Sequence, residues 1–244
     1  MTRYRASAIH LAISASVVGG VLATVFLFWY PGPTFDISGA RIPVFVLVGV
    51  DLVLGPLLTL IVYKEGKRGM KFDLAFIASV QLVALMYGAG TLHAERPTYL
   101  VFAIDRISLV SHKNIDHSLI QHDALRQKPF RKLINVFART PVDPEEFNRF
   151  MNSVLFKNMP DLDLRAEYWE PWDAGADVIR NAIIPLRNFE TDSEVEQQEV
   201  SDAIARHEHT RLGFLPIGGI DDDIGLLVDM DSLVPLDVIR VDPW

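Results

Sequence analysis

Hydrophobic residues are concentrated in three long runs within the first 95 positions of the chain. The runs cover Leu11–Trp29, Ile42–Tyr63 and Leu74–Leu92, with 19, 22 and 19 residues. At about 1.5 Å per residue, each helix would be roughly 28–33 Å long, which matches a hydrocarbon core of about 30 Å. The pattern therefore predicts a bundle of three transmembrane helices in residues 1–95.

The first run has two interpretations, because Arg3 and Arg5 precede it as they would precede a secretory signal peptide. Its apolar stretch is longer than the usual signal core of about 7–15 residues. It also ends in Trp29-Tyr30-Pro31 rather than at a small-residue cleavage site. An uncleaved anchor is the favoured interpretation.

Basic residues between the runs predict the orientation of the bundle. They gather at the N-terminus and between the second and third runs: Arg3, Arg5, Lys64, Lys67, Arg68 and Lys71. The loop between the first and second runs offers only Arg41. Because Lys and Arg favour the cytoplasmic side, we expect a cytoplasmic N-terminus. An odd number of spans then sends residues 96–244 to the opposite side of the membrane.

Two polar residues, Asp51 and Gln81, lie deep inside the second and third runs. They are about 13.5 and 16.5 Å from the outer ends of their helices, so they could meet at nearly one level. A charge at this depth costs roughly 2.5–3.5 kcal/mol, so Asp51 needs a partner or a proton. Three interpretations are open: a hydrogen bond to Gln81 that locks the bundle, a polar group on another protein's helix, or a proton or ion pathway. Gly55-Pro56 should kink the second span and free a carbonyl nearby.

Residues 96–244 alternate between strand and helix signals without strict order, which predicts an α+β domain. The expected strands are Tyr99–Ile104 with a continuation at Ile107–Val110, and a tail of short strands that form an antiparallel sheet: Phe214–Ile217, Ile224–Val228 and Leu236–Val241. Ser193 should cap a helix that runs to about His207.

Another helix is expected after Asp143, which should serve as its N-cap ahead of Pro144. Apolar residues follow at helical spacing and should form one core-facing stripe: Phe147, Phe150, Met151, Val154 and Leu155.

Charge separates the two regions of the chain and narrows the classes of partner. Residues 1–95 hold 7 Lys and Arg against 5 Asp and Glu, whereas residues 96–244 hold 16 against 26. Neither region has the basic surplus that binding to nucleic acid requires. The chain also has no cysteine, which excludes disulfides, zinc–thiolate sites and cysteine nucleophiles.

Motifs for catalysis or for a cofactor are not found in the sequence, so neither an enzyme nor a bound cofactor is expected. His112, His117 and His122 recur at a spacing that fits neither a helix nor a strand, which favours a solvated loop over a metal site. The segment 207–209 lacks the zinc-protease spacing. The acidic segment 221–223 lacks the calcium-loop order and is expected to be a turn.

Four segments of the chain resemble the type IV pilin accessory proteins of the TfpX/TfpZ type. They are residues 29–33 (WYPGP), residues 49–62 (GVDLVLGPLLTLIV), residues 96–106, which begin RPTYLVF, and residues 241–244 (VDPW). The positions that carry the resemblance are Trp29, Tyr30, Pro31, Gly32, Pro33, Asp51, Gly55, Pro56, Arg96, Pro97, Asp242, Pro243 and Trp244. The likeness is most specific in residues 49–62.

This resemblance implies a multi-pass protein of the inner membrane of Gram-negative bacteria, with residues 96–244 in the periplasm. It implies that the chain assists type IV pilin before or during pilus assembly. The layout of the chain, a three-helix bundle joined to an acidic domain, matches the apolar helix and periplasmic head of a pilin, and it suggests a non-enzymatic, chaperone-like protein that binds or stabilises pilin. The expected partners are the major pilin, the lipid bilayer and other pilus-assembly proteins. The competing interpretations are a membrane-anchored sensor or transporter subunit that binds a small ligand, and a membrane-bound enzyme.

Overall fold

The computed structural model describes residues 2–31, 34–126, 133–207, 210–218 and 224–242. Its chain divides into two compact units, Met1–Arg96 (unit 1) and Pro97–Trp244 (unit 2).

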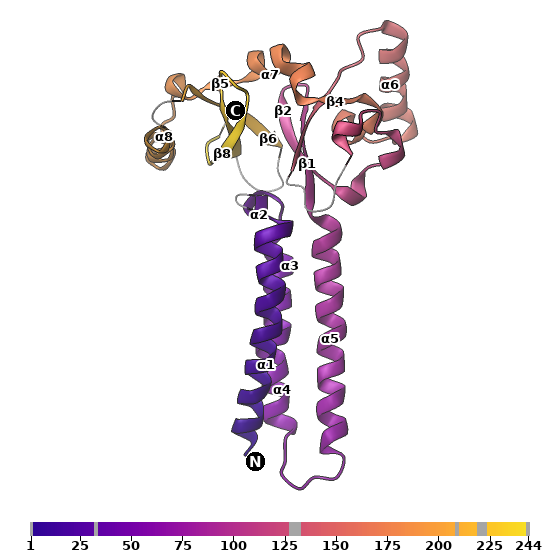
Figure 1. Cartoon of the computed structure of the whole chain (residues 1–244), viewed down its shortest axis with the longest axis vertical. Helices are drawn as coiled ribbons and strands as arrows, with labels where there is room; N and C mark the ends of the chain where they lie inside the picture. Colours follow the sequence, from indigo (N-terminus) through magenta and orange to yellow (C-terminus); the bar gives the residue numbers. More distant parts are fainter. Residues whose placement is uncertain (1, 32–33, 127–132, 208–209, 219–223, 243–244) are drawn as a thin grey trace. The chain divides into compact units, whose positions relative to one another are not determined.

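The elements described in unit 1 are all helices (Figure 1). Its elements are α1 (Arg3–Thr24), η1 (Val25–Trp29), α2 (Thr34–Ile37), α3 (Arg41–Val48), η2 (Gly49–Leu54), α4 (Gly55–Val62) and α5 (Met70–Glu95). Because η1 continues α1, and η2 joins α3 to α4, three long helices result, of 27, 22 and 26 residues. Each is long and apolar enough to cross a membrane.

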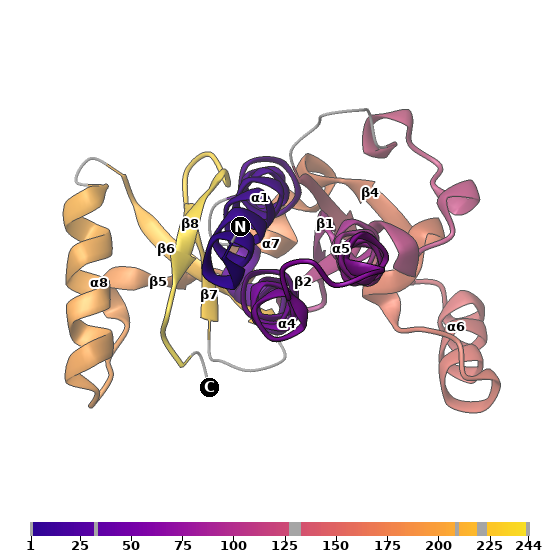
Figure 2. The ribbon, with the colours of Figure 1, turned by 90° about the horizontal axis from the view of Figure 1, so that it is seen from below.

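The middle one of the three long helices makes most of the contacts between them. α1 lies along α4 and η2, and α5 packs against α3 and α4. Figure 2 shows α1 beside α4 in an end-on view. The hydrophobic cluster between them includes Val18, Val25, Tyr30, Leu47, Leu85 and Leu92. Many large apolar side chains point outward, among them Phe28, Phe45 and Phe76 at 67%, 75% and 62% exposure. An apolar exterior of this extent is what a membrane-embedded surface requires.

In its described residues, unit 2 combines one sheet with three α-helices. The strands are β1 (Pro97–Ala103), β2 (Arg106–Ser111), β3 (Ile134–Ala138), β4 (Trp169–Pro171), β5 (Ile184–Pro185), β6 (Leu212–Gly218), β7 (Ile224–Asp229) and β8 (Pro235–Ile239). The α-helices are α6 (Pro144–Lys157), α7 (Ala176–Ala182) and α8 (Glu194–Arg206). Short 3-10 turns connect them: η3 (His112–Asn114), η4 (His117–Leu119), η5 (Asp123–Leu125), η6 (Leu162–Leu164), η7 (Ala166–Tyr168), η8 (Trp172–Gly175) and η9 (Leu186–Asn188).

The sheet of unit 2 is mixed, so the prediction of an antiparallel sheet is wrong. Its order is β4-β3-β1-β2-β6-β7-β8, with β5 beside β6. The tail strands β6, β7 and β8 do pair antiparallel as expected, but β1 pairs parallel with β3, and β2 pairs parallel with β6. Local patterns identify strands, whereas these parallel pairs join segments that are distant in sequence.

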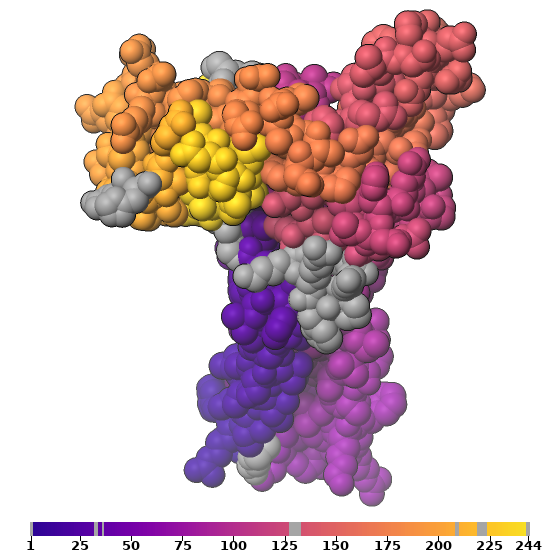
Figure 3. All heavy atoms as spheres, turned by 45° about the horizontal axis from the view of Figure 1, so that its top comes forward, coloured from indigo at the N-terminus to yellow at the C-terminus, as the bar shows by residue number. Residues whose placement is uncertain are grey.

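The sheet has two parts, each with its own hydrophobic cluster. One cluster gathers residues of β1, β3, β4 and α6, including Tyr99, Val136 and Trp169. The other gathers residues of α8, β6, β7 and β8, including Phe214 and Leu227. Helices α6 and α8 lie at opposite ends of unit 2 (Figures 2 and 3). Among the described residues, two register pairs, Ile107↔Ile217 and Ser108↔Gly218, join β2 to β6 between these parts.

The expected continuation of the first strand is instead a hairpin. β1 and β2 pair antiparallel, with Ala103 opposite Arg106, so Ile104 and Asp105 form the turn. Ile104 adopts the left-handed backbone conformation with φ of 62°, where glycine or asparagine is usual and a β-branched residue is strained. The turn therefore lacks the glycine or asparagine by which such a hairpin is usually recognised.

Both helix starts predicted from capping residues are confirmed. Asp143 Oδ1 accepts a hydrogen bond from Glu146 N at 2.9 Å at the start of α6, and Ser193 Oγ accepts from Glu196 N at 3.4 Å at the start of α8. The apolar stripe of α6 is only partly buried, which corrects the expectation that the whole stripe is core. Phe150 is buried and Met151 and Val154 pack against the core, but Phe147 and Leu155 are 42% and 64% exposed.

Candidate functional site

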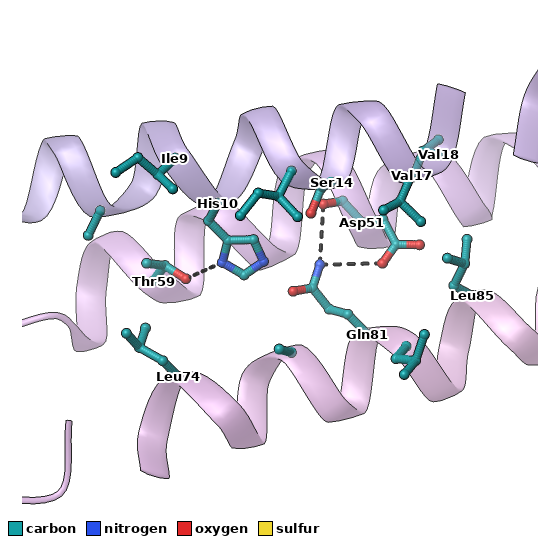
Figure 4. A pocket seen from close by; sticks show the side chains of 14 residues that line it. Ile9, His10, Ser14, Val17, Val18, Asp51, Thr59, Leu74, Gln81 and Leu85 are labelled. Carbon is teal, nitrogen blue, oxygen red and sulfur yellow. Dashed lines mark hydrogen bonds between the residues drawn. The ribbon is translucent and has the colours of Figure 1, made fainter. Parts of the chain in front are cut away.

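A cluster of polar side chains lies inside the apolar helices of unit 1, near the middle of their length. The structure brings Asp51 of η2 and Gln81 of α5 together: Gln81 Nε2 donates to Asp51 Oδ1 at 3.3 Å and to the Asp51 backbone carbonyl at 3.2 Å (Figure 4). The two residues are only 4% and 8% exposed. A single amide thus binds both the side chain and the backbone of the buried acid.

The backbone carbonyl of Asp51 is free for this bond because of the π-helical turn and the proline that follows. In η2 the N–H of Gly55 donates to Val50 O, five residues back. The next N–H in that series, which would donate to Asp51 O, belongs to Pro56, and proline has no N–H. Gln81 therefore satisfies a carbonyl that the helix cannot satisfy itself. Single π-helical turns within α-helices are frequently found at functional sites.

Gly55 provides the space that Gln81 occupies. A Cβ built on Gly55 would lie 2.0 Å from Gln81 Nε2 and 2.5 Å from its Cδ. Any larger residue would therefore displace the amide from Asp51. The sequence predicts that Gly55-Pro56 kinks the second span and frees a carbonyl nearby. In the structure, Pro56 leaves the Asp51 carbonyl without an N–H donor from the helix, and Gly55 leaves room for the Gln81 amide.

Further polar contacts join α1 to α4 close to this cluster. His10 Nδ1 and Thr59 Oγ1 lie 2.5 Å apart within a hydrogen bond, and Ser7 Oγ donates to Pro56 O at 2.9 Å. Sequence reasoning misses these residues because the first continuous apolar run begins at Leu11, whereas α1 begins at Arg3. The signal was available, since Ser7, His10 and Ser14 are spaced to share one face of a helix.

Two oxygen atoms in the cluster have no hydrogen-bond partner among the residues that the structure describes: Asp51 Oδ2 and Gln81 Oε1. Both residues line a cavity of about 450 Å³ between α1 and α5. An amide oxygen accepts hydrogen bonds, and so does a carboxylate oxygen. The arrangement can therefore bind a hydrogen-bond donor.

The aromatic residues at the end of the first long helix fasten it to the end of α5. The hydroxyl of Tyr30, which is 2% exposed, donates to Leu92 O at 2.8 Å. The ring of Trp29 lies edge-on to His93, with 5.0 Å between centroids. These two family-like positions are packing contacts within unit 1.

The other family-like positions are less informative. Arg96 donates to His93 O at 2.6 Å, and Pro97 begins β1 opposite Ser111. The backbone N–H of Asp242 donates to Glu196 Oε1 at 3.3 Å. Pro31 is partly buried. Four further positions lie outside the described residues: Gly32, Pro33, Pro243 and Trp244.

The histidines of unit 2 are closer together than their spacing suggested. The rings of His112 and His117 have centroids 4.0 Å apart, and His117 Nε2 donates to His112 O at 2.8 Å. His122 is exposed. Within the described part of the chain, no group of three or more His, Asp or Glu residues could hold a metal ion. Residues 208–209 and 221–223, considered above for metal binding, lie outside the described residues.

Comparison with known proteins gives matches across most of the chain. The family model for the fimbrial assembly protein FimB matches residues 1–39. Fimbrial assembly proteins of Dichelobacter nodosus serogroups I and E1 are each 29% identical, over 219 and 218 residues, which is 86% of this chain and 84% of theirs. The protein of serogroups C1 and C2 is 34% identical over 111 residues, which is 45% of this chain and 85% of that protein.

No solved structure is a significant match to this fold. The sequence relatives nevertheless agree with the resemblance noted from the motifs, and the 34% identical relative is covered over most of its length. The chain belongs to the fimbrial assembly protein family that includes FimB.

Proposed function

We propose that this chain is a non-enzymatic accessory protein that binds type IV pilin in the inner membrane and assists its assembly into pili. The observation that carries the proposal is the match to two proteins named fimbrial assembly proteins over 86% of the chain. The three long apolar helices support it, because a protein that handles a membrane-held subunit needs a membrane-embedded part.

In this proposal the three helices of residues 1–95 cross the inner membrane, and residues 96–244 fold in the periplasm. The N-terminus and the loop that joins α4 to α5 are cytoplasmic, because they carry basic residues: Arg3, Arg5, Lys64, Lys67, Arg68 and Lys71. Alkaline phosphatase fused after residue 244 should be active, and fused after Lys67 it should be silent. The reverse activities would refute this orientation.

The compositions of the two units suggest that they contribute differently to the recognition of pilin. Contacts among apolar helices in lipid discriminate weakly, because lipid tails are equally apolar. Unit 2 is strongly acidic, since residues 97–244 hold 26 acidic against 15 basic side chains, and complementary charge favours specific, fast association. We therefore assign discrimination between pilins to unit 2, which should bind a basic or mixed patch on the pilin head.

The proposal is tested by purifying the tagged full-length chain from pilus-producing cells in mild detergent. Pilin should co-purify, and more salt in the wash should reduce its amount because charge attraction is screened. A deletion strain should lose surface pili while it still synthesises pilin. Normal piliation of that strain would refute the proposal, and so would a complete absence of pilin from the purified material.

Exchange of residues 97–244 for those of a relative that serves a different pilin tests this assignment of discrimination to unit 2. Piliation should follow the donor of the exchanged segment. If piliation follows the donor of the helices instead, recognition lies in unit 1.

A further inference from the structure

A groove lies between α1 and α5 in unit 1. It has a volume of about 450 Å³, and Asp51 and Thr59 of the middle helix line it together with residues of α1 and α5 (Figure 4). Because α1 rests mainly on α4 and η2, and α5 on α3 and α4, the two outer helices leave a place beside the middle one.

The walls of this groove are two rows of side chains at helical spacing. Ile9, Ile13 and Val17 of α1 form one row, and Leu74, Ala78 and Leu82 of α5 form the other. Both rows follow an i, i+4, i+8 pattern, which is the ridge that a neighbouring helix packs against. The small residues Ala6, Ser14 and Ala78 in the lining permit close approach of a backbone.

The polar part of the lining separates this groove from an ordinary lipid-facing surface. Asp51 Oδ2 and Gln81 Oε1 have no partner among the described residues, although both side chains are more than nine-tenths buried. A lipid acyl chain has no donor to offer to these oxygens. An unpaired polar atom inside the hydrocarbon region costs several kcal/mol, which favours an occupant that brings a donor.

We propose that this groove receives the membrane-embedded helix of pilin, and that this helix carries a hydrogen-bond donor at the level of Asp51. The inference rests on the proposed function, because it takes pilin to be the partner. The incoming helix packs its apolar side chains between the two rows and completes a four-helix arrangement around the middle span. Its donor reaches Asp51 Oδ2, while Gln81 keeps Asp51 Oδ1 and the backbone carbonyl.

The first experiment locates the partner with a photo-crosslinking phenylalanine analogue at single positions of the full-length chain in pilus-producing cells. Leu82 lines the groove, and its neighbour Val83 lines neither cavity described in unit 1; they are 56% and 67% exposed. The probe at Leu82 should give an adduct that antibody to pilin detects, at least tenfold stronger than the adduct from Val83. Equal adducts at both positions would overturn the inference, and so would a self-adduct or lipid adduct alone at Leu82.

The second experiment tests the donor with Asp51→Asn. The amide oxygen of the variant can still accept from Gln81, but its NH₂ group then faces the incoming donor in place of Oδ2. We expect normal abundance of the chain and a roughly tenfold weaker pilin adduct at Leu82. An unchanged adduct would overturn the assignment of the donor.

These outcomes separate the groove from the proposed function. If pilin co-purifies with the chain but Leu82 and Val83 react alike, the groove inference fails and the role in assembly stands. If pilin does not co-purify at all, the proposed function fails and takes the groove inference with it.

Discussion

Substitution of Gly55 by alanine should open the polar cluster without adding or removing any polar group. The new Cβ would lie 2.0 Å from Gln81 Nε2, far inside contact distance. Gln81 must therefore rotate away, and both of its hydrogen bonds to Asp51, at 3.2 and 3.3 Å, are lost. The backbone of Gly55 is helical, so alanine causes no backbone strain there.

The magnitude follows from the two lost bonds. Hydrogen bonds between membrane helices contribute about 0.6 kcal/mol on average and up to about 1.7 kcal/mol, so losing both costs roughly 1–3 kcal/mol. Alanine returns up to about 1 kcal/mol through its higher helix propensity. We expect the helix bundle to lose about 1–2 kcal/mol of stability in total. This loss increases the population of the open state, in which the helices have moved apart, about 5–30-fold.

The chain has no cysteine, so one introduced cysteine can report opening. Val18 is 1% exposed, so a thiol reagent reaches Val18→Cys only when the bundle opens. The labelling rate of this cysteine in detergent should rise about 5–30-fold when Gly55→Ala is added. Gly20→Ala is the matched control, because a Cβ on Gly20 meets nothing within 4 Å. In a Gln81→Ala background the cost of Gly55→Ala should vanish. Equal labelling of the Gly55 and Gly20 variants would refute the reasoning, and so would an undiminished cost in that background.

Three predictions concern unit 2, and each uses thermal or acid unfolding of the full chain followed by near-UV circular dichroism. Tyr99→Phe should raise stability by about 1 kcal/mol, because the buried hydroxyl has no partner among the described residues; a lower melting temperature would contradict this. Ile104→Gly should stabilise by about 1 kcal/mol by relieving a left-handed, largely exposed isoleucine, and a destabilised variant would show that Ile104 makes a needed contact. Hydrogen bonds from the Ser232 hydroxyl and the Asp231 N–H hold the pKa of Asp229 below its usual value. The stability from these bonds is present above the usual pKa and lost as pH falls through the lowered one, so Ser232→Ala should unfold at higher pH in an acid titration; an unchanged acid midpoint would contradict this.

Sequence reasoning succeeded where the physical cause is local. Apolar run lengths located the three long helices, and Asp143 and Ser193 located two helix starts, because each signal depends on a few neighbouring residues. The meeting of Asp51 and Gln81 was also anticipated, since depth along two helices needs only the rise per residue.

Sequence reasoning failed where distant segments or unusual backbone decide the result. The parallel pairing of β2 with β6 joins residues more than 100 positions apart, and nothing in either strand encodes its partner. The hairpin at Ile104 lacks a glycine or asparagine, so its residues gave no sign of a turn. The role of Gly55 depends on a side chain from another helix, which only a structure can place beside it.

The narrow junction between the two parts of the sheet has a mechanical consequence. A tensile load that pulls these parts apart acts on the two described register pairs of β2 with β6, on the hydrogen bond from Trp172 Nε1 to Leu233 O, and on the buried apolar contacts around Ile107 and Ile217. Neighbouring ladders, such as that of β6 with β7, share such a load over six pairs. We therefore expect unit 2 to yield first at this junction, while each part keeps its own hydrophobic cluster intact.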